Sequence, residues 1–74
     1  MDDYVTIGPG VNIAASCRIG EGAFLGIGAI VRDHVEIGAH SVVGAGAVVT
    51  GSVPERVMVF GNPARIIKRN VQGM

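Results

Sequence analysis

The sequence predicts an all-β fold in which the chain coils as a β-helix with three flat sides to each turn. Three observations support this prediction: an aliphatic residue recurs every six positions, the apolar residues are mostly β-branched or small, and 12 of the 74 residues are Gly. β-branched residues favour strands and Gly favours tight corners, so short strands are expected in place of helices. A β-sandwich is the general alternative for such a composition.

The six-residue repeat extends from Met1 to Pro54. A period of six matches neither an α-helix, which repeats about every 3.6 residues, nor a flat strand, which repeats about every two. It matches a chain that turns a corner after each hexad, so that residues eighteen apart stack in parallel ladders about 4.8 Å apart. The first position of the nine hexads is always aliphatic: Met1, Ile7, Ile13, Ile19, Leu25, Val31, Ile37, Val43 and Val49.

The period predicts three turns of the coil with inward columns of apolar side chains. The larger inward residues are expected to stack as Ile7–Leu25–Val43, Ile13–Val31–Val49 and Met1–Ile19–Ile37. The fifth position of each hexad is small or Val and supplies the columns Val5–Ala23–Ser41, Val11–Ala29–Ala47 and Cys17–Val35–Val53. Outward positions also carry apolar residues, which a side-by-side trimer would cover: Ile27, Ile30, Val42 and Val48.

The chain divides into the repeat, residues 1–54, and a C-terminal segment, residues 55–74, that leaves the six-residue register. In this segment Val57–Phe60 is expected to form a closing strand and Gly61-Asn62-Pro63 a turn. Residues 64–70 are expected to form a short basic helix or an extended cap. Their cations would face solvent, or phosphates if a ligand groove lies nearby.

The composition excludes several classes of function. Formal net charge is zero, which argues against a general nucleic-acid partner and against an anionic membrane partner. Cys17 is the single cysteine, so neither an internal disulfide nor a Cys-rich zinc site is expected. The longest apolar stretch, residues 23–31, is too short to span a bilayer, and Asp2 and Asp3 are unlike the start of a signal peptide. We expect a cytoplasmic protein.

Two glycine-rich stretches, residues 24–31 and 42–49, look like the start of a nucleotide-binding loop. A dinucleotide site requires a strand, a GxGxxG loop and then a helix, but here the six-residue period continues through both stretches. We therefore interpret these glycines as corners of the coil. Pro9, Ile27 and Ala45 then form one outward column, flanked by bare backbone that a ligand could approach closely.

His34 and His40 occupy the same position of successive hexads, so we expect them on different corners of the coil. One chain cannot bring both imidazoles to one metal ion, and we expect no metal site. The simplest interpretation is that both are solvated surface residues. An acid–base role is the alternative, because imidazole exchanges protons near neutral pH.

Two stretches together carry a resemblance to a known family: IGEGAFLGIGAIVRDHVEIGAHSVVGAGAVV, followed by VPERVMVFGNPARIIK. They resemble the C-terminal part of hexapeptide-repeat acyltransferases, and are most similar to the sialic-acid O-acetyltransferases and bacillosamine N-acetyltransferases. The resemblance covers about residues 5–69, and its more specific parts are FLGIG and GNPAR. It implies a left-handed parallel β-helix, a homotrimer, and acetyl-CoA bound in grooves between neighbouring protomers.

The resemblance also implies a reaction and the positions that serve it. An acetyl group would pass from acetyl-CoA to a small-molecule acceptor, a sugar or sugar-nucleotide amine or hydroxyl. Backbone at Ile27 and Ala45 would contact the cofactor, and the Ala15 N–H would face the thioester oxygen as an oxyanion donor. The turn and the basic tail would lie toward the nucleotide. The full set of implied cofactor positions is Thr6, Ala15, Ile27, Ala45, Asn62, Pro63, Arg65 and Lys68.

The sequence departs from the family pattern at the acid–base part of the site. The family's general base is a His just upstream of the repeat, and ungapped matching places it before Met1. Thr6 stands where the family usually has a second His, and the N-terminal sugar-nucleotide domain has no counterpart. We therefore expect a truncated acyltransferase that retains the cofactor side of the site. No residue matches the family's catalytic His, which leaves His34 and His40 as the candidates.

Two other classes of function remain open. A non-catalytic trimeric β-helix, serving as an assembly module or a CoA-binding module, would equally lack a catalytic His. A trimeric zinc enzyme resembling γ-carbonic anhydrase collects three His across a subunit interface and would require a bound metal ion.

Overall fold

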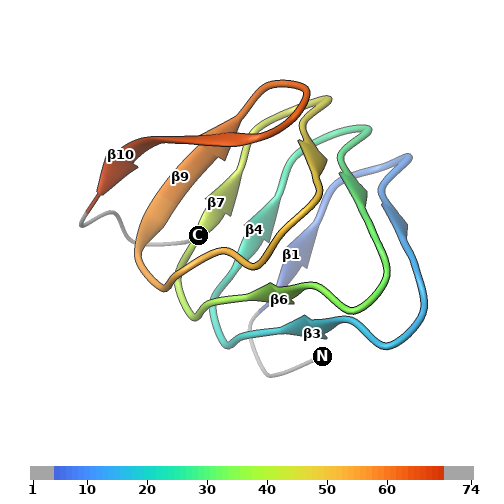
Figure 1. Cartoon of the computed structure of the whole chain (residues 1–74), viewed down its shortest axis with the longest axis horizontal. Helices are drawn as coiled ribbons and strands as arrows, with labels where there is room; N and C mark the ends of the chain where they lie inside the picture. The colour runs from blue at the N-terminus through green and yellow to red at the C-terminus, as the bar shows by residue number, and fades with distance from the viewer. Residues whose placement is uncertain (1–4, 70–74) are drawn as a thin grey trace.

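The computed structural model describes residues 5–69, over which the chain coils around one axis and ends in a hairpin (Figure 1). Eight two-residue strands recur every six residues: β1 (Thr6–Ile7), β2 (Asn12–Ile13), β3 (Arg18–Ile19), β4 (Phe24–Leu25), β5 (Ile30–Val31), β6 (Glu36–Ile37), β7 (Val42–Val43) and β8 (Val48–Val49). Two longer strands follow, β9 (Val57–Phe60) and β10 (Arg65–Arg69). No helix occurs among the described residues, and hence none that could cross a membrane.

The strands form three sheets, which are the three flat sides of the coil. Face A contains β1, β4, β7, β9 and β10 in that order, face B contains β2, β5 and β8, and face C contains β3 and β6. The pairs along β1–β4–β7, β2–β5–β8 and β3–β6 are all parallel and join residues eighteen apart, such as Ile7 with Leu25. The predicted three-sided parallel β-helix is therefore confirmed.

The second residue of each short strand stacks inside the coil, as the period predicts. Face A carries the Ile7–Leu25–Val43 ladder, and face B carries the Ile13–Val31–Val49 ladder. On face C, Ile19 pairs with Ile37, while Met1 lies outside the described residues. In the middle turns these side chains are almost completely buried, and the small fifth-position residues fill the space beside them, Ala23, Ala29 and Ala47 being fully buried. One aliphatic side chain per strand and a small residue at each corner thus fill the coil without aromatic residues.

From the second hexad to the eighth, each corner contains one residue whose backbone is left-handed, at the fourth position of the hexad. The φ angles there are 71° at Gly28 and Gly46, and 59° at both His34 and His40. The N–H of this residue donates to the carbonyl of the corner one turn earlier, as in Gly46 to Ile27 at 2.8 Å. Gly adopts this conformation without strain, and His tolerates it better than most residues. The glycines of residues 24–31 and 42–49 are thus corners, as predicted.

The third turn is two residues shorter than the period predicts. Val53 pairs with Ile37, sixteen residues away, and so does not continue the predicted Cys17–Val35–Val53 column. One turn earlier, the Arg18 N–H donates to the backbone carbonyl of Val35. The equivalent Glu36 N–H donates instead to the side-chain hydroxyl of Ser52, at 3.4 Å. The prediction was wrong because Val53 is aliphatic and therefore fits the inward position of either register.

The short turn also explains a buried polar residue in the core. Ser41 lies in an inward column and is fully buried, as the hexad pattern predicts. Its hydroxyl donates to the carbonyl of Pro54 in the turn that follows. A buried hydroxyl without a partner would be costly, so this bond makes Ser compatible with a column that is otherwise Val and Ala.

After Val53 the six-residue spacing resumes and carries face A one strand further. β9 pairs in parallel with β7, joining Val43 to Val59, which confirms the predicted closing strand. Residues 61–64 form a turn, also as predicted, and β10 returns antiparallel to β9. Of the two forms predicted for residues 64–70, the structure has the extended one through Arg69, and Asn70 lies outside the described residues.

The different burial of Leu25 and Ile27 predicts that truncating them lowers the free energy of unfolding by different amounts. Leu25 is fully buried in the face A ladder, whereas Ile27 is 63% exposed at a corner. We expect Leu25→Ala to lower the free energy of unfolding by about 2–5 kcal/mol, because it leaves a cavity in the coil. Ile27→Ala should change it by no more than about 0.5 kcal/mol. Urea denaturation at one fixed protein concentration measures both, and equal losses would contradict the inward–outward assignment.

Candidate functional site

Pro9, Ile27 and Ala45 lie on one corner of the coil, between faces A and B, as the sequence predicts; we call them the corner column. The carbonyls of Pro9 and Ile27 accept the N–H groups of Gly28 and Gly46, at 3.0 and 2.8 Å. The N–H groups of Ile27 and Ala45 make no backbone hydrogen bond within residues 5–69, and both residues are exposed. The corner column therefore offers two backbone donors on successive turns.

Face A carries a second column, which connects two of the predicted cofactor positions. In register, Thr6 pairs with Phe24, Phe24 with Val42, Val42 with Met58, and Met58 with Lys68. Thr6 and Lys68 are exposed, and the three apolar side chains between them are half-buried. Four strand spacings of about 4.8 Å place the backbones of Thr6 and Lys68 about 19 Å apart. Face A is thus an apolar strip with a hydroxyl at one end and a cation at the other.

The C-terminal turn lies above the corner column. It is attached to β8 by two hydrogen bonds, from the Val48 N–H to Gly61 O at 2.9 Å and from the Ala64 N–H to Val48 O at 2.8 Å. Asn62 and Pro63 lie within this turn and are exposed. Arg65 begins β10 directly after it. The structure thus brings these three predicted positions to the same end of the coil, beyond Ala45.

Phe60 is a residue of this corner that the sequence analysis did not single out. Its side chain is 52% exposed, and its ring lies against Gly44, the residue before Ala45. It pairs across the hairpin with Arg65. The sequence signal for this contact is weak, because it depends on β9 stacking on β7 after the short third turn has shifted the register.

Ala15 lies on a different corner, between faces B and C. Its carbonyl accepts the His34 N–H at 3.1 Å, and its own N–H makes no backbone hydrogen bond among the described residues. Ala15 is therefore a free donor, as the resemblance requires. Within one chain, however, it is separated from the corner column by the whole width of face B.

The two histidines lie on different corners, as predicted. His34 is exposed beside Ala15, whereas His40 lies between faces C and A with its ring against Gly22. The His40 N–H donates to Glu21 O at 2.8 Å. Neither imidazole lies on the corner column. Across the described residues, no three His, Cys, Asp or Glu side chains lie close enough to hold a metal ion.

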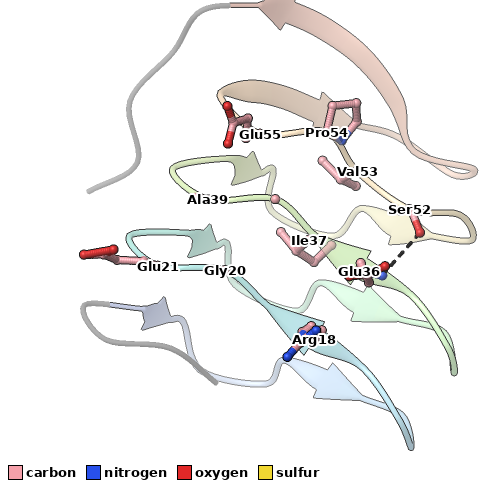
Figure 2. Close-up of a pocket in the computed structure, with 11 residues that line it drawn as sticks. Arg18, Gly20, Glu21, Glu36, Ile37, Ala39, Ser52, Val53, Pro54 and Glu55 are labelled. Carbon is pink, nitrogen blue, oxygen red and sulfur yellow. Dashed lines mark hydrogen bonds between the residues drawn. The ribbon is translucent and has the colours of Figure 1, made fainter.

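Face C has an open groove of about 650 Å³ that contains none of the predicted site residues (Figure 2). Arg18, Glu36 and Ser52 lie across it, while Glu21 and Glu55 lie at the corner along one side. The short third turn forms its upper edge, through Val53 and Pro54. The six-residue repeat does not predict this groove, because its upper edge is formed by the turn that departs from the repeat by two residues.

The charges are divided between the two ends of the chain, although the net charge is zero. Residues 1–55 carry all six acidic residues and two arginines. The remaining four cations are Arg56, Arg65, Lys68 and Arg69, and no acidic residue follows Glu55. β10 lies at the end of face A, so three of these cations gather at one end of the coil (Figure 1). Anions are therefore attracted to that end of the coil, and Arg65, which pairs with Phe60, is the β10 cation on the side of the corner column.

Residues 16–51 match the family model of the bacterial transferase hexapeptide, which comprises six repeats. This stretch contains the strands from β3 to β8 and the corners between them. The chain belongs to the hexapeptide-repeat acetyltransferase family.

Three relatives illustrate the range of this family. Perosamine N-acetyltransferase from Caulobacter crescentus, solved as a mutant with CoA and GDP-perosamine, is 44% identical with a TM-score of 0.86 over 86% of this chain and 30% of that one. The acetyltransferase domain of PglB from Neisseria gonorrhoeae, solved with acetyl coenzyme A, is 38% identical with a TM-score of 0.84 over 85% of this chain and 31% of that one. Galactoside O-acetyltransferase from Lactococcus lactis is 45% identical over 72% of this chain and 25% of the enzyme. This chain thus spans about a quarter to a third of each relative.

Proposed function

We propose that the chain forms the cofactor side of an acetyl-CoA-dependent acetyltransferase whose acceptor is a sugar or sugar-nucleotide amine or hydroxyl. The observation that carries the proposal is the corner column, with two unpaired backbone donors beside a cationic end. Relatives solved with CoA or acetyl coenzyme A have the same fold at 38–44% identity. The two acceptor classes follow from the sugar N- and O-acetyltransferases among those relatives.

The residues of the site fit an extended thioester cofactor. The N–H groups of Ile27 and Ala45 would donate to the amide carbonyls of its pantetheine arm, which the apolar strip of face A would cover. Arg65 and Lys68 would bind its phosphates, and Asn62 and Pro63 would border the nucleotide. When bound, acetyl-CoA supplies an acetyl group activated as a thioester. Thr6 lies at the far end of the strip, where that group would be held.

A trimer would complete the site, because Ala15 is too far from the corner column within one protomer. Two faces carry apolar outward residues, Phe24 and Val42 on face A and Ile30 and Val48 on face B, whereas face C carries Arg18. A closed ring of three needs two different contact surfaces on each protomer. Faces A and B supply them. Ala15 borders face B, so its N–H would approach the neighbouring protomer's site and stabilise the oxyanion.

The described residues supply no general base at the corner column. Thr6 has no basic group, and both imidazoles lie on other corners. A missing general base typically slows proton transfer by about 10²–10⁴-fold. This observation favours a second candidate function, a trimeric CoA-binding or assembly module in which this chain binds without turnover. A base from another chain would restore the reaction.

Binding of CoA tests the cofactor assignment. Substitution by proline removes a single backbone N–H donor, so it tests one predicted hydrogen bond at a time. Pro9 occupies the same corner position as Ala45, which indicates that a proline ring fits there. We expect Ala45→Pro to weaken CoA binding about 2- to 12-fold, because it removes one N–H donor. Ala39→Pro makes the same change on the corner between faces C and A, and should leave CoA affinity unchanged. Isothermal titration measures both variants, and thermal melts check that both fold. An absence of CoA binding by the native chain would overturn the proposal.

Thiol release from acetyl-CoA tests whether this chain supplies a general base by itself. We expect turnover with amino sugars or galactosides to be at or near the uncatalysed rate for this chain alone. His34→Ala and His40→Ala should not change it, because neither imidazole lies near the corner column. A rate well above background that either substitution abolishes would show that the histidine is the base. Retained CoA binding without turnover would support the module.

A further inference from the structure

Among residues 5–69, Phe60 is the exposed aromatic residue, and its ring lies beside the corner column. It follows the last buried residue of β9, Val59, and its ring packs on the backbone of Gly44. Because Gly44 immediately precedes Ala45, the ring lies one strand beyond the last donor of the corner column. A ligand extended along that column from Ile27 through Ala45 reaches Phe60 next.

The position of the Phe60 ring is fixed by close contact with the backbone. A Cβ atom at residue 44 would collide with the ring, so Gly is required there for the contact to form. The Gly61 carbonyl, next along the chain, accepts the Val48 N–H at 2.9 Å and holds this end of the hairpin on face B. Even so, 52% of the Phe60 side chain remains exposed, which is unusual for a residue that only fills a core.

The charge beside Phe60 is positive. Arg65 is its partner across the β9–β10 hairpin, and no acidic residue lies in residues 56–74. An aromatic face with a neighbouring arginine suits a ligand that carries both a flat base and phosphate groups, because aromatic side chains stack on bases and guanidinium groups bind phosphates. An apolar partner surface would not require the cation.

We propose that Phe60 is a stacking platform for the adenine ring of the cofactor, and that it therefore makes the site selective for the nucleotide-bearing form of the pantetheine thiol. The proposal rests on the proposed function and adds a residue that determines specificity. The order along the corner is then two amide donors, an aromatic platform and Arg65. CoA carries a partner for each of these groups: amide carbonyls on the pantetheine arm, phosphate groups for Arg65, and an adenine base for Phe60.

The test compares two ligands that share the pantetheine arm. CoA carries the adenosine 3′,5′-diphosphate portion, and 4′-phosphopantetheine lacks the adenosine. We expect Phe60→Ala to weaken CoA binding about tenfold in isothermal titration, which is typical of losing one base stack, and to leave 4′-phosphopantetheine unchanged. Phe60→Trp should retain CoA affinity. Ile67→Ala, which truncates a comparably exposed residue of β10, is the matched control and should change neither affinity.

The outcomes separate this proposal from the proposed function. If the native chain binds CoA but Phe60→Ala weakens both ligands equally, or neither, the platform is overturned while the cofactor site stands. If Phe60→Ala dissociates the oligomer in sedimentation experiments, Phe60 is a subunit contact and the platform is likewise overturned. If the native chain binds 4′-phosphopantetheine as tightly as CoA, the site does not select for the nucleotide, and the proposal fails.

Discussion

The structure depends on one constraint: every turn of the coil must make its backbone hydrogen bonds to the turn before it. A strand of two residues contributes few such bonds, so the corners take part as well. At most corners a left-handed residue turns the chain, and in the second and third turns it donates its N–H to the corner below, as Gly46 does to Ile27. Buried backbone groups left without partners would be costly, and this requirement fixes both the spacing and the shape.

The same constraint explains why a binding surface can consist of backbone. Once a corner carbonyl is used in the ladder, the N–H of the same residue is left free, and each turn repeats the arrangement about 4.8 Å further along. Ile27 and Ala45 therefore present donors at regular intervals whatever their side chains are. The stretch around Gly26 and Gly28 resembles the glycine-rich loop of dinucleotide-binding sites, but its glycines have a different role. Its glycines serve the corners, and the donors belong to the residues between them.

The features that distinguish this chain from a regular β-helix occur where the six-residue repeat is interrupted. The short third turn forms the upper edge of the groove on face C and supplies the Pro54 carbonyl to Ser41. β9 then stacks on β7 and sets Phe60 against Gly44, and β10 gathers cations at the same end. A regular repeat would give three equivalent corners. These departures make the corner between faces A and B different from the other two.

The sequence by itself determined the β-helix, its inward ladders, the corner glycines and the corner column, because a repeat of fixed length leaves one way to stack successive turns. It also determined that His34 and His40 occupy separate corners. Only the tertiary structure decided the register of Val53, since an aliphatic residue fits two positions that differ by two residues. It likewise decided that β10 returns along β9 and that Phe60 reaches Gly44. Both contacts involve residues after Pro54, where the six-residue repeat has ended, so the periodicity of the sequence does not predict them.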